Sequence, residues 1–204
     1  MNKQALLKFA VLFMLVYLAL LALSLQLGQY YVEFMLPLYR WEIGWLSPDY
    51  RIISLAFADD RSEGVVALTM NLISYIVVAG HALPPGGNIS SSTLSGHALQ
   101  HPLVMLSLLV ALPASNISHR IALLSVAAPL LLMVEIFDVP LVLLGSIEDL
   151  ILANIAPDTS SILVMWMNFM NGGGRLAFSI VAALAAYVAG RILSRTWLSF
   201  GTKI

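Results

Sequence analysis

Four long apolar stretches divide the chain, and their lengths predict helices that cross a lipid bilayer. They cover residues 5–27, 94–112, 121–144 and 163–193. A helix rises about 1.5 Å per residue, so about 20 apolar residues cross a hydrocarbon core of roughly 30 Å. The last stretch is too long for one straight crossing. We expect residues 171–174 to divide it into a short outer helix, a flexible joint and a crossing over residues 175–193.

The first apolar stretch fits two interpretations. A basic start followed by an apolar run is typical of a cleaved signal peptide and also of a membrane anchor. The run over residues 5–27 is long for a signal peptide. We therefore favour an uncleaved signal anchor whose N-terminus stays in the cytoplasm.

Residues 28–92 differ in composition from the rest of the chain. The segment begins with Tyr and Trp side chains over residues 29–45, and such residues favour the level of the lipid headgroups. A Pro- and Gly-rich run at residues 84–88 predicts a loop. Residues 89–96 either continue this loop or begin the next helix.

The middle of this segment predicts a β-hairpin. Residues 50–58 form the first strand, with Ile53, Leu55 and Phe57 on one face, because alternation of this kind is typical of a strand. A turn at residues 59–64 leads to a returning strand over residues 65–78, with Thr69 and Asn71 on its polar face. A membrane helix over residues 65–78 is the alternative, but this segment is short for a crossing and polar residues interrupt it.

The charges set the expected orientation. All eleven acidic residues lie between Glu33 and Asp158, whereas both ends carry only basic residues, and Arg120 lies between the second and third spans. Short cytoplasmic segments of membrane proteins are rich in Lys and Arg. We therefore expect an α-helical membrane protein with four transmembrane helices, both termini in the cytoplasm, and an extracytoplasmic β-hairpin insert between spans 1 and 2. The expected location is the bacterial cytoplasmic (inner) membrane.

This interpretation divides the chain into three parts. Residues 1–27 form the signal-anchor helix, and residues 28–92 form the outer segment with its hairpin at about residues 50–78. Residues 93–204 form a three-helix transmembrane bundle with a short outer loop at residues 145–161, part of which is a candidate interfacial helix.

Composition excludes several classes of protein. Hydrophobic residues make up 60% of the chain and charged residues 10%, whereas a soluble domain carries about 25% charged residues. The lipid bilayer is therefore the expected environment. The net charge of −1 argues against a nucleic-acid partner. The chain has no cysteine, which excludes thiol chemistry and disulfides.

Glu135, Asp138 and Arg175 are the ionisable residues that the topology explains least well. The two acids lie three residues apart in the third span and share a helix face. An ionisable group at membrane depth usually faces a cavity or a partner. The acids are candidates for proton transfer, cation binding or an ion pair, for which Arg175 is the natural partner. Alternatively, the acids mark the headgroup level and Arg175 snorkels or binds an anionic headgroup.

His97 and His101 are the one candidate metal site. They lie four residues apart on the predicted second helix, so both rings share one face. The alternative is a pair of interfacial histidines that bind water or backbone groups. The sequence identifies no other cofactor, and no catalytic motif is present.

Small residues predict the surfaces through which the last helix packs. Such surfaces allow close helix packing, either within this chain or with another subunit. The candidates are Gly172, Gly173, Gly174, Ala182, Ala186 and Gly190.

The layout resembles that of the small integral membrane proteins that accompany bacterial exosortases. The resemblance rests on residues 102–106, residues 109–112, Arg120 and residues 173–176, and covers the C-terminal half. It implies an accessory role without catalytic residues. We expect a non-catalytic accessory, assembly or stabilising subunit that contacts other integral membrane subunits. The alternative is a membrane enzyme or an ion- or proton-handling protein that uses Glu135, Asp138 and Arg175, with the histidines as a metal site.

Overall fold

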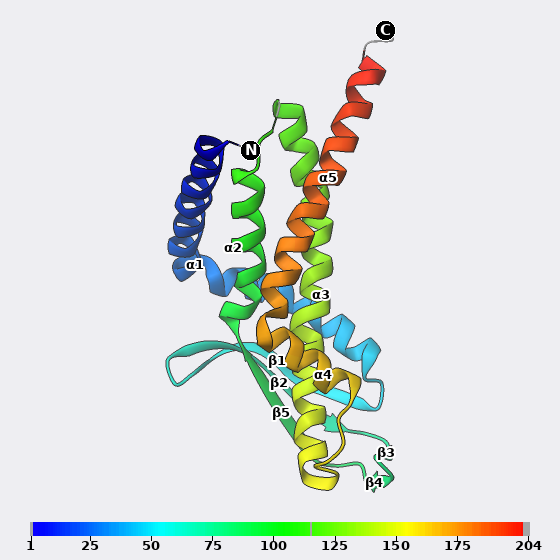
Figure 1. Ribbon diagram of the computed structural model, residues 1–204. Helices are drawn as coiled ribbons and strands as arrows, with labels where there is room; N and C mark the ends of the chain where they lie inside the picture. The colour runs from blue at the N-terminus through cyan, green and yellow to red at the C-terminus, as the bar shows by residue number, and fades with distance from the viewer. Residues whose placement is uncertain (1, 115, 202–204) are drawn as a thin grey trace. The chain divides into compact units, whose positions relative to one another are not determined.

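The computed structural model describes residues 2–114 and 116–201, with side chains described as far as Ser194. Figure 1 labels its helices and strands. The helices are α1 (Lys3–Leu46), α2 (Ser95–Ala111), α3 (Ile117–Ile155), α4 (Ile162–Phe169) and α5 (Arg175–Gly201), with a π-helical turn η1 (Met170–Gly174) between the last two. The strands are β1 (Tyr50–Asp60), β2 (Glu63–Leu72), β3 (Ile76–Val78), β4 (His81–Leu83) and β5 (Asn88–Leu94).

Three helical segments among the described residues are long and apolar enough to cross a membrane. They are Lys3–Leu46, Ile117–Ile155 and Ile162–Ser194. These segments mark the chain as a membrane-associated protein and correspond to the first, third and last predicted spans. The second predicted span coincides with α2, which has only 17 residues. At about 1.5 Å per residue α2 is shorter than a hydrocarbon core of roughly 30 Å.

The chain forms two compact units, and each combines segments that are distant in sequence. The first comprises residues 1–26, 100–134 and 176–204, and the second comprises residues 27–99 and 135–175. The core of the first unit is small and lies between α2, α3 and α5. Its buried residues are Met105, Leu109, Leu123, Ala127, Val134, Ala182, Ala183 and Ala186.

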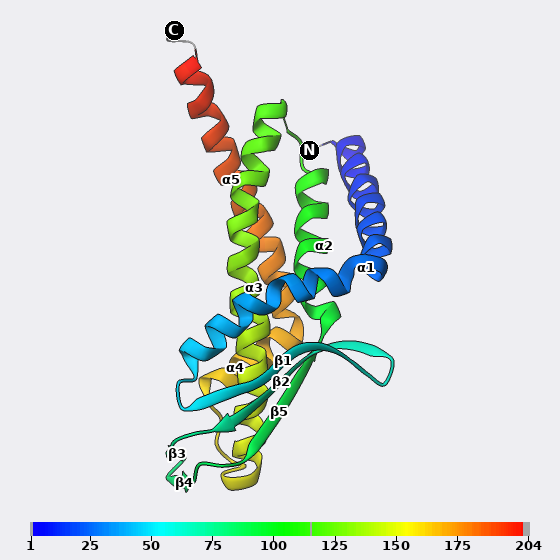
Figure 2. The same cartoon turned by 180° about the vertical axis from the view of Figure 1, so that it is seen from behind.

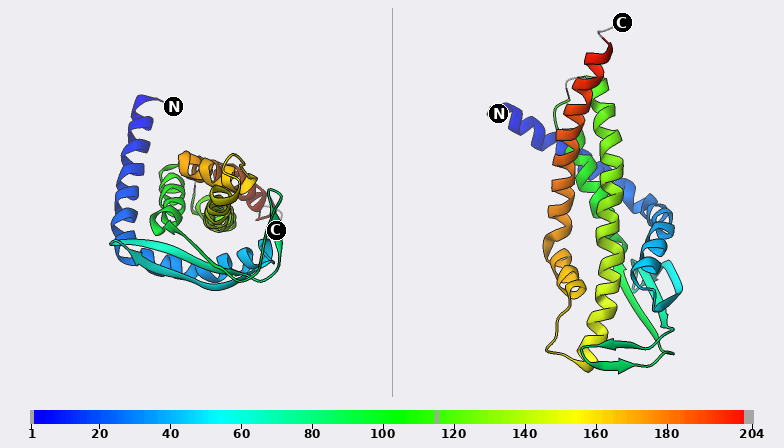
Figure 3. Two further views of the ribbon diagram at one scale, coloured as in Figure 1. Left: turned by 90° about the horizontal axis from the view of Figure 1, so that it is seen from below. Right: turned by 90° about the vertical axis from the view of Figure 1, so that its right-hand side faces the viewer.

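The core of the second unit lies between a β-sheet and parts of two helices. Strand β2 lies between β1 and β5, and both pairings are antiparallel. Val66, Leu68 and Met70 of β2 share a buried cluster with side chains of α1 and α3. Figures 2 and 3 show the part of α1 after residue 27 lying across the part of α3 after residue 135, with the sheet beside them. The Ser91 hydroxyl donates a hydrogen bond of 3.0 Å to the Leu143 carbonyl, which joins β5 to α3.

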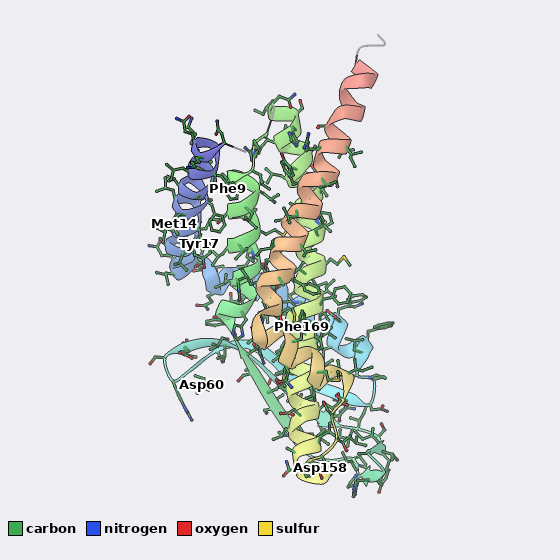
Figure 4. All side chains as sticks on the ribbon, viewed as in Figure 1. Phe9, Met14, Tyr17, Asp60, Asp158 and Phe169 are labelled. Atoms are coloured by element: carbon green, nitrogen blue, oxygen red, sulfur yellow. The ribbon has the colours of Figure 1, made fainter. Side chains whose placement is uncertain are left out.

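The predicted hairpin is confirmed over residues 50–72, but its returning strand ends at Leu72 rather than at residue 78. Asp60 pairs with Glu63, so Arg61 and Ser62 form a two-residue turn. Both have positive φ angles, 51° and 69°, as a type I′ hairpin turn requires. Figure 4 shows Asp60 at the end of this hairpin. The alternative of a helix over residues 65–78 is wrong, because β2 ends at Leu72 and β3 pairs with β4 in a separate two-stranded sheet.

The prediction that Ile53, Leu55 and Phe57 share one face of β1 is partly wrong. Leu55 and Phe57 do belong to the core side, but Ile53 is 51% exposed and Ile52 packs against the core instead. The register of β1 against β2 shifts between Ile52 and Ser54. An extra residue in one strand reverses which side chains face inward, so the alternation before the bulge is opposite to the one after it.

Two predicted connections have regular structure. Residues 88–94 form β5, although we expected a loop or a helix start at residues 89–96. Four consecutive polar residues interrupt the alternation of apolar and polar positions that would predict a strand. The segment becomes a strand because its backbone pairs with β2. The outer loop expected at residues 145–161 is helical up to Ile155, because α3 continues into the core of the second unit. Figure 4 shows Asp158 in the connection that follows.

The predicted division of the last apolar stretch at residues 171–174 is confirmed. Helix α4 ends at Phe169, η1 covers Met170–Gly174, and α5 begins at Arg175. Gly173 has a φ angle of 111°, a conformation that only glycine adopts without strain. Ser161 caps the start of α4 by accepting a hydrogen bond from the Val164 amide.

Candidate functional site

Arg175 and Asp138 form a buried ion pair. The Arg175 Nε–H donates to both carboxylate oxygens of Asp138, at 2.9 and 2.8 Å. The two side chains are 4% and 0% exposed. A third contact fixes the guanidinium, because its Nη1 donates to Oδ1 of Asn171 at 2.8 Å. Hydrogen bonds between charged groups in such surroundings are strong and hold one geometry.

The glycine-rich joint places this arginine. Arg175 is the first residue of α5, and Asn171 lies one helical turn earlier within η1. A Cβ at Gly174 would lie 2.8 Å from the Phe169 carbonyl oxygen, so the tight turn requires glycine at that position. The positive φ of Gly173 redirects the chain. The local sequence thus brings the guanidinium and its amide partner to the same side of the joint.

Two tyrosine hydroxyls hold the second acid. Glu135 is fully buried. Its Oε1 accepts a hydrogen bond of 2.6 Å from the Tyr31 hydroxyl, and its Oε2 accepts one of 2.5 Å from the Tyr39 hydroxyl. Both tyrosines belong to α1, about 100 residues earlier in the chain. A buried carboxylate needs such donors, because desolvation without compensation is costly.

We name Tyr31, Tyr39, Glu135, Asp138 and Arg175, together with Asn171, the polar network. All six lie in the second unit. The proximity of Asp138 and Arg175 was one of the predicted alternatives. By contrast, Glu135 is held by tyrosines that we had assigned to the headgroup level.

A signal for the tyrosines was present in the sequence. Val32, Met35, Tyr39 and Ile43 recur at helical spacing, and all four are buried on one face of α1. This periodicity would have extended the first helix to Leu46 and placed Tyr39 on its inward face. The partner of Tyr39 could not be read from the periodicity, because it lies 96 residues away.

The two candidate histidines each have a hydroxyl partner. The Nδ1 atom of His97 lies 3.0 Å from the Thr93 hydroxyl oxygen, and that of His101 lies 2.9 Å from the Ser179 hydroxyl oxygen. Across residues 2–114 and 116–201, no three or more His, Cys, Asp or Glu side chains are grouped closely enough to hold a metal ion. A metal at His97 and His101 would need a further ligand from elsewhere.

The small residues of α5 pack within this chain. Ala182 and Ala186 belong to the core of the first unit. A Cβ at Gly190 would lie 2.9 Å from the Cα atom of Leu123, so glycine permits close contact between α5 and α3. Around the joint, Gly174 is buried, whereas a Cβ at Gly172 would meet nothing within 4 Å.

Comparison with known proteins adds no relative. No family model, no curated protein and no solved structure matches this chain.

Proposed function

We propose that this protein is a non-catalytic accessory or assembly subunit of a larger membrane complex in the bacterial inner membrane. The observation that carries the proposal is the exposure of α1. None of the 18 residues in its most apolar stretch is buried. Apolar side chains such as Leu6, Leu15 and Leu23 are 55%, 61% and 50% exposed, and at 3.6 residues per turn they lie on different faces of the helix. Figure 4 labels Phe9, Met14 and Tyr17 along this part of α1.

The exposed helix needs an apolar environment on every side. Lipid supplies part of it, and helix association in lipid depends on packing with a partner rather than on the hydrophobic effect. A second surface supports docking outside the hydrocarbon. Strand β1 lies at an edge of its sheet, and an edge strand can accept another strand by backbone hydrogen bonds.

The polar network supports the non-catalytic part of the proposal. Its two acids and its arginine hold one another or are held by hydroxyl and amide groups of the same chain. Such internal pairing is typical of groups that fix a structure. The resemblance to exosortase-associated proteins points to the same kind of role, in a system that sorts exported proteins.

The proposed topology has four crossings, with α2 as the second and both termini in the cytoplasm. The charge distribution supports this orientation. Because the chain has no cysteine, single cysteines report it directly. We expect Asp60→Cys in intact cells to react with an impermeant maleimide. Asn116→Cys, which is also exposed but lies between α2 and α3, is expected to react only after permeabilisation. Equal labelling of both positions in intact cells contradicts the topology.

Site-specific photo-crosslinking tests the accessory role. A photoreactive amino acid at Leu15 on α1 or at Ile53 on β1 is expected to crosslink a defined integral membrane protein in native membranes. The same group at Ala183, which is buried in the first unit, serves as the matched control and should crosslink only within the chain. A stable monomer without a crosslinked partner at Leu15 and Ile53 would exclude the accessory role.

A further inference from the structure

Strand β5 leaves one edge of the three-stranded sheet open to a further strand. It pairs with β2 on one side, and within the part of the chain that the structure describes no strand pairs with its other side. Figures 1 and 2 show β5 as the outermost strand of this sheet, opposite β1. The backbone amides and carbonyls along such an edge can accept an extended segment of another chain.

The edge of β5 lacks the features that usually prevent such pairing. Natural edge strands carry charged residues or proline, or a bulge interrupts them. The seven residues Asn88–Leu94 include no charged residue and no proline. Their register against β2 is continuous over all seven pairs. A regular, neutral edge of this kind favours the addition of a strand.

A pocket of about 280 Å³ lies beside this edge strand. Its wall is formed by the end of β2, by β4 and the loop after it, by the start of β5 and by the last turns of α3. The apolar side chains that line it include those of Leu72, Leu83, Pro84, Ile89, Leu150 and Ile155. Leu150 is 49% exposed, so the wall of the pocket reaches the surface of the protein.

An added strand would bring a side chain to this pocket. Along β5, Ile89, Ser91 and Thr93 are less exposed than the residues between them, so they mark the core side of the strand. On an added antiparallel strand, the residue opposite Ile89 faces the same side, with its Cβ about 4.5–5.5 Å from that of Ile89. Because Ile89 also lines the pocket, the side chain opposite it lies at the pocket.

The lining of the pocket selects an apolar side chain. Among the described residues that line it, none is charged and Asn154 has the one polar side chain. The Asn154 Nδ2 already donates a hydrogen bond of 2.7 Å to the Leu150 carbonyl. A charged side chain would lose its hydration here without gaining a charged partner. Sites for small molecules usually measure about 300–1,000 Å³ and contain several placed polar groups, so a side chain held by backbone pairing fits this pocket better.

We propose that β5 binds an extended segment of another protein as a fourth strand of the sheet, with a leucine-sized apolar side chain in the pocket. Backbone hydrogen bonds to β5 supply affinity, and the pocket supplies specificity for the residue opposite Ile89. The accessory role places its contacts on α1 and β1. The β5 site therefore goes beyond that role and does not depend on it.

Fluorescence anisotropy with a labelled peptide tests the site on the purified full-length protein in detergent. The probe is an acetylated and amidated seven-residue peptide of threonine and serine with a single leucine at its centre, and micelles without protein give the background. Replacing the leucine by asparagine is expected to weaken binding about tenfold or more, because the apolar contact in the pocket is lost. N-methylation of every second amide removes the donors from one edge of the peptide at a time. One of the two N-methylated peptides should therefore lose binding, and the other should keep it.

A protein variant locates the binding to the pocket. Leu150→Asp is expected to weaken binding of the leucine peptide about tenfold or more, because it places a charge in the pocket wall. Ile162→Asp is the matched control and should bind like the wild type, since Ile162 is 84% exposed in the same unit and does not line the pocket. Thermal unfolding checks that both variants fold, and the peptide comparisons on the wild type decide the question even where Leu150→Asp does not.

Three results overturn the proposal. Equal binding of the leucine and asparagine peptides would show that the pocket selects no side chain. Equal binding of both N-methylated peptides would show that no strand forms. A dimer in light scattering that excludes the peptide would identify a second copy of the chain as the occupant of the edge.

Discussion

Arg175→Met is expected to destabilise the protein by about 3–5 kcal/mol, because it leaves the Asp138 carboxylate buried without its counter-charge. The wild-type Nε–H contacts both oxygens of an acid that is 0% exposed. Denaturant titration in detergent micelles, followed by circular dichroism, measures the change. Arg175→Lys keeps the charge but not the planar donor geometry, so we expect a smaller loss of stability.

Two further variants show whether the loss of stability comes from breaking the ion pair or from removing any arginine. Arg40→Met removes an exposed arginine of the same unit and is expected to change stability by less than about 0.5 kcal/mol. Arg175→Met combined with Asp138→Leu removes both charges and should recover much of the loss, since an apolar pair avoids the desolvation cost. If the double variant is no more stable than Arg175→Met, the pair does not act as described.

Tyr39→Phe is expected to cost about 1.5–3 kcal/mol, because it removes the hydroxyl that donates to Oε2 of the buried Glu135 carboxylate. Tyr31→Phe removes the donor to Oε1 and should have an effect of the same kind. The same unfolding measurement applies. Tyr30→Phe is the matched control, since Tyr30 is 67% exposed, and its effect should be within about 0.5 kcal/mol.

A double-mutant cycle tests whether the Glu135 carboxylate is the reason that Tyr39→Phe costs this much stability. In a Glu135→Gln background the acceptor is neutral, so Tyr39→Phe should cost about 0.5–1.5 kcal/mol, as for an ordinary hydrogen bond. The coupling between the two positions is then the difference between the two costs of Tyr39→Phe. Equal costs in both backgrounds would mean that the hydroxyl and the carboxylate do not interact.

The features that sequence predicts correctly are those set by neighbours in the chain. The turn at Arg61 and Ser62 follows from polar residues between two alternating runs. The joint at Gly173 follows from three consecutive glycines inside a stretch too long for one crossing. Thr69 was expected on a polar face, and there its hydroxyl lies 2.9 Å from that of Ser90 on the neighbouring strand.

The features that sequence reasoning missed depend on partners far away in the chain. Strand β5 has four consecutive polar residues and forms because β2 offers it an edge. The bulge in β1 reverses the facing of Ile52 and Ile53, and no property of the two isoleucines distinguishes them beforehand. Helix α3 extends to Ile155 because its last turns bury Ile147 and Ile151 in the core of the second unit.

The sequence by itself determined that the chain contains membrane-length apolar helices, a hairpin with a tight turn, and a glycine joint beside an arginine. Hydrophobic period, segment length and turn chemistry are local quantities, so they can be read without a structure. Only the tertiary structure decided which donors hold which acid. Glu135 accepts hydrogen bonds from the hydroxyls of Tyr31 and Tyr39, which lie 104 and 96 residues away in the chain. Arg175 pairs with Asp138 instead. Burial makes each of these charges costly, and the fold offsets that cost with partners that local periodicity does not identify.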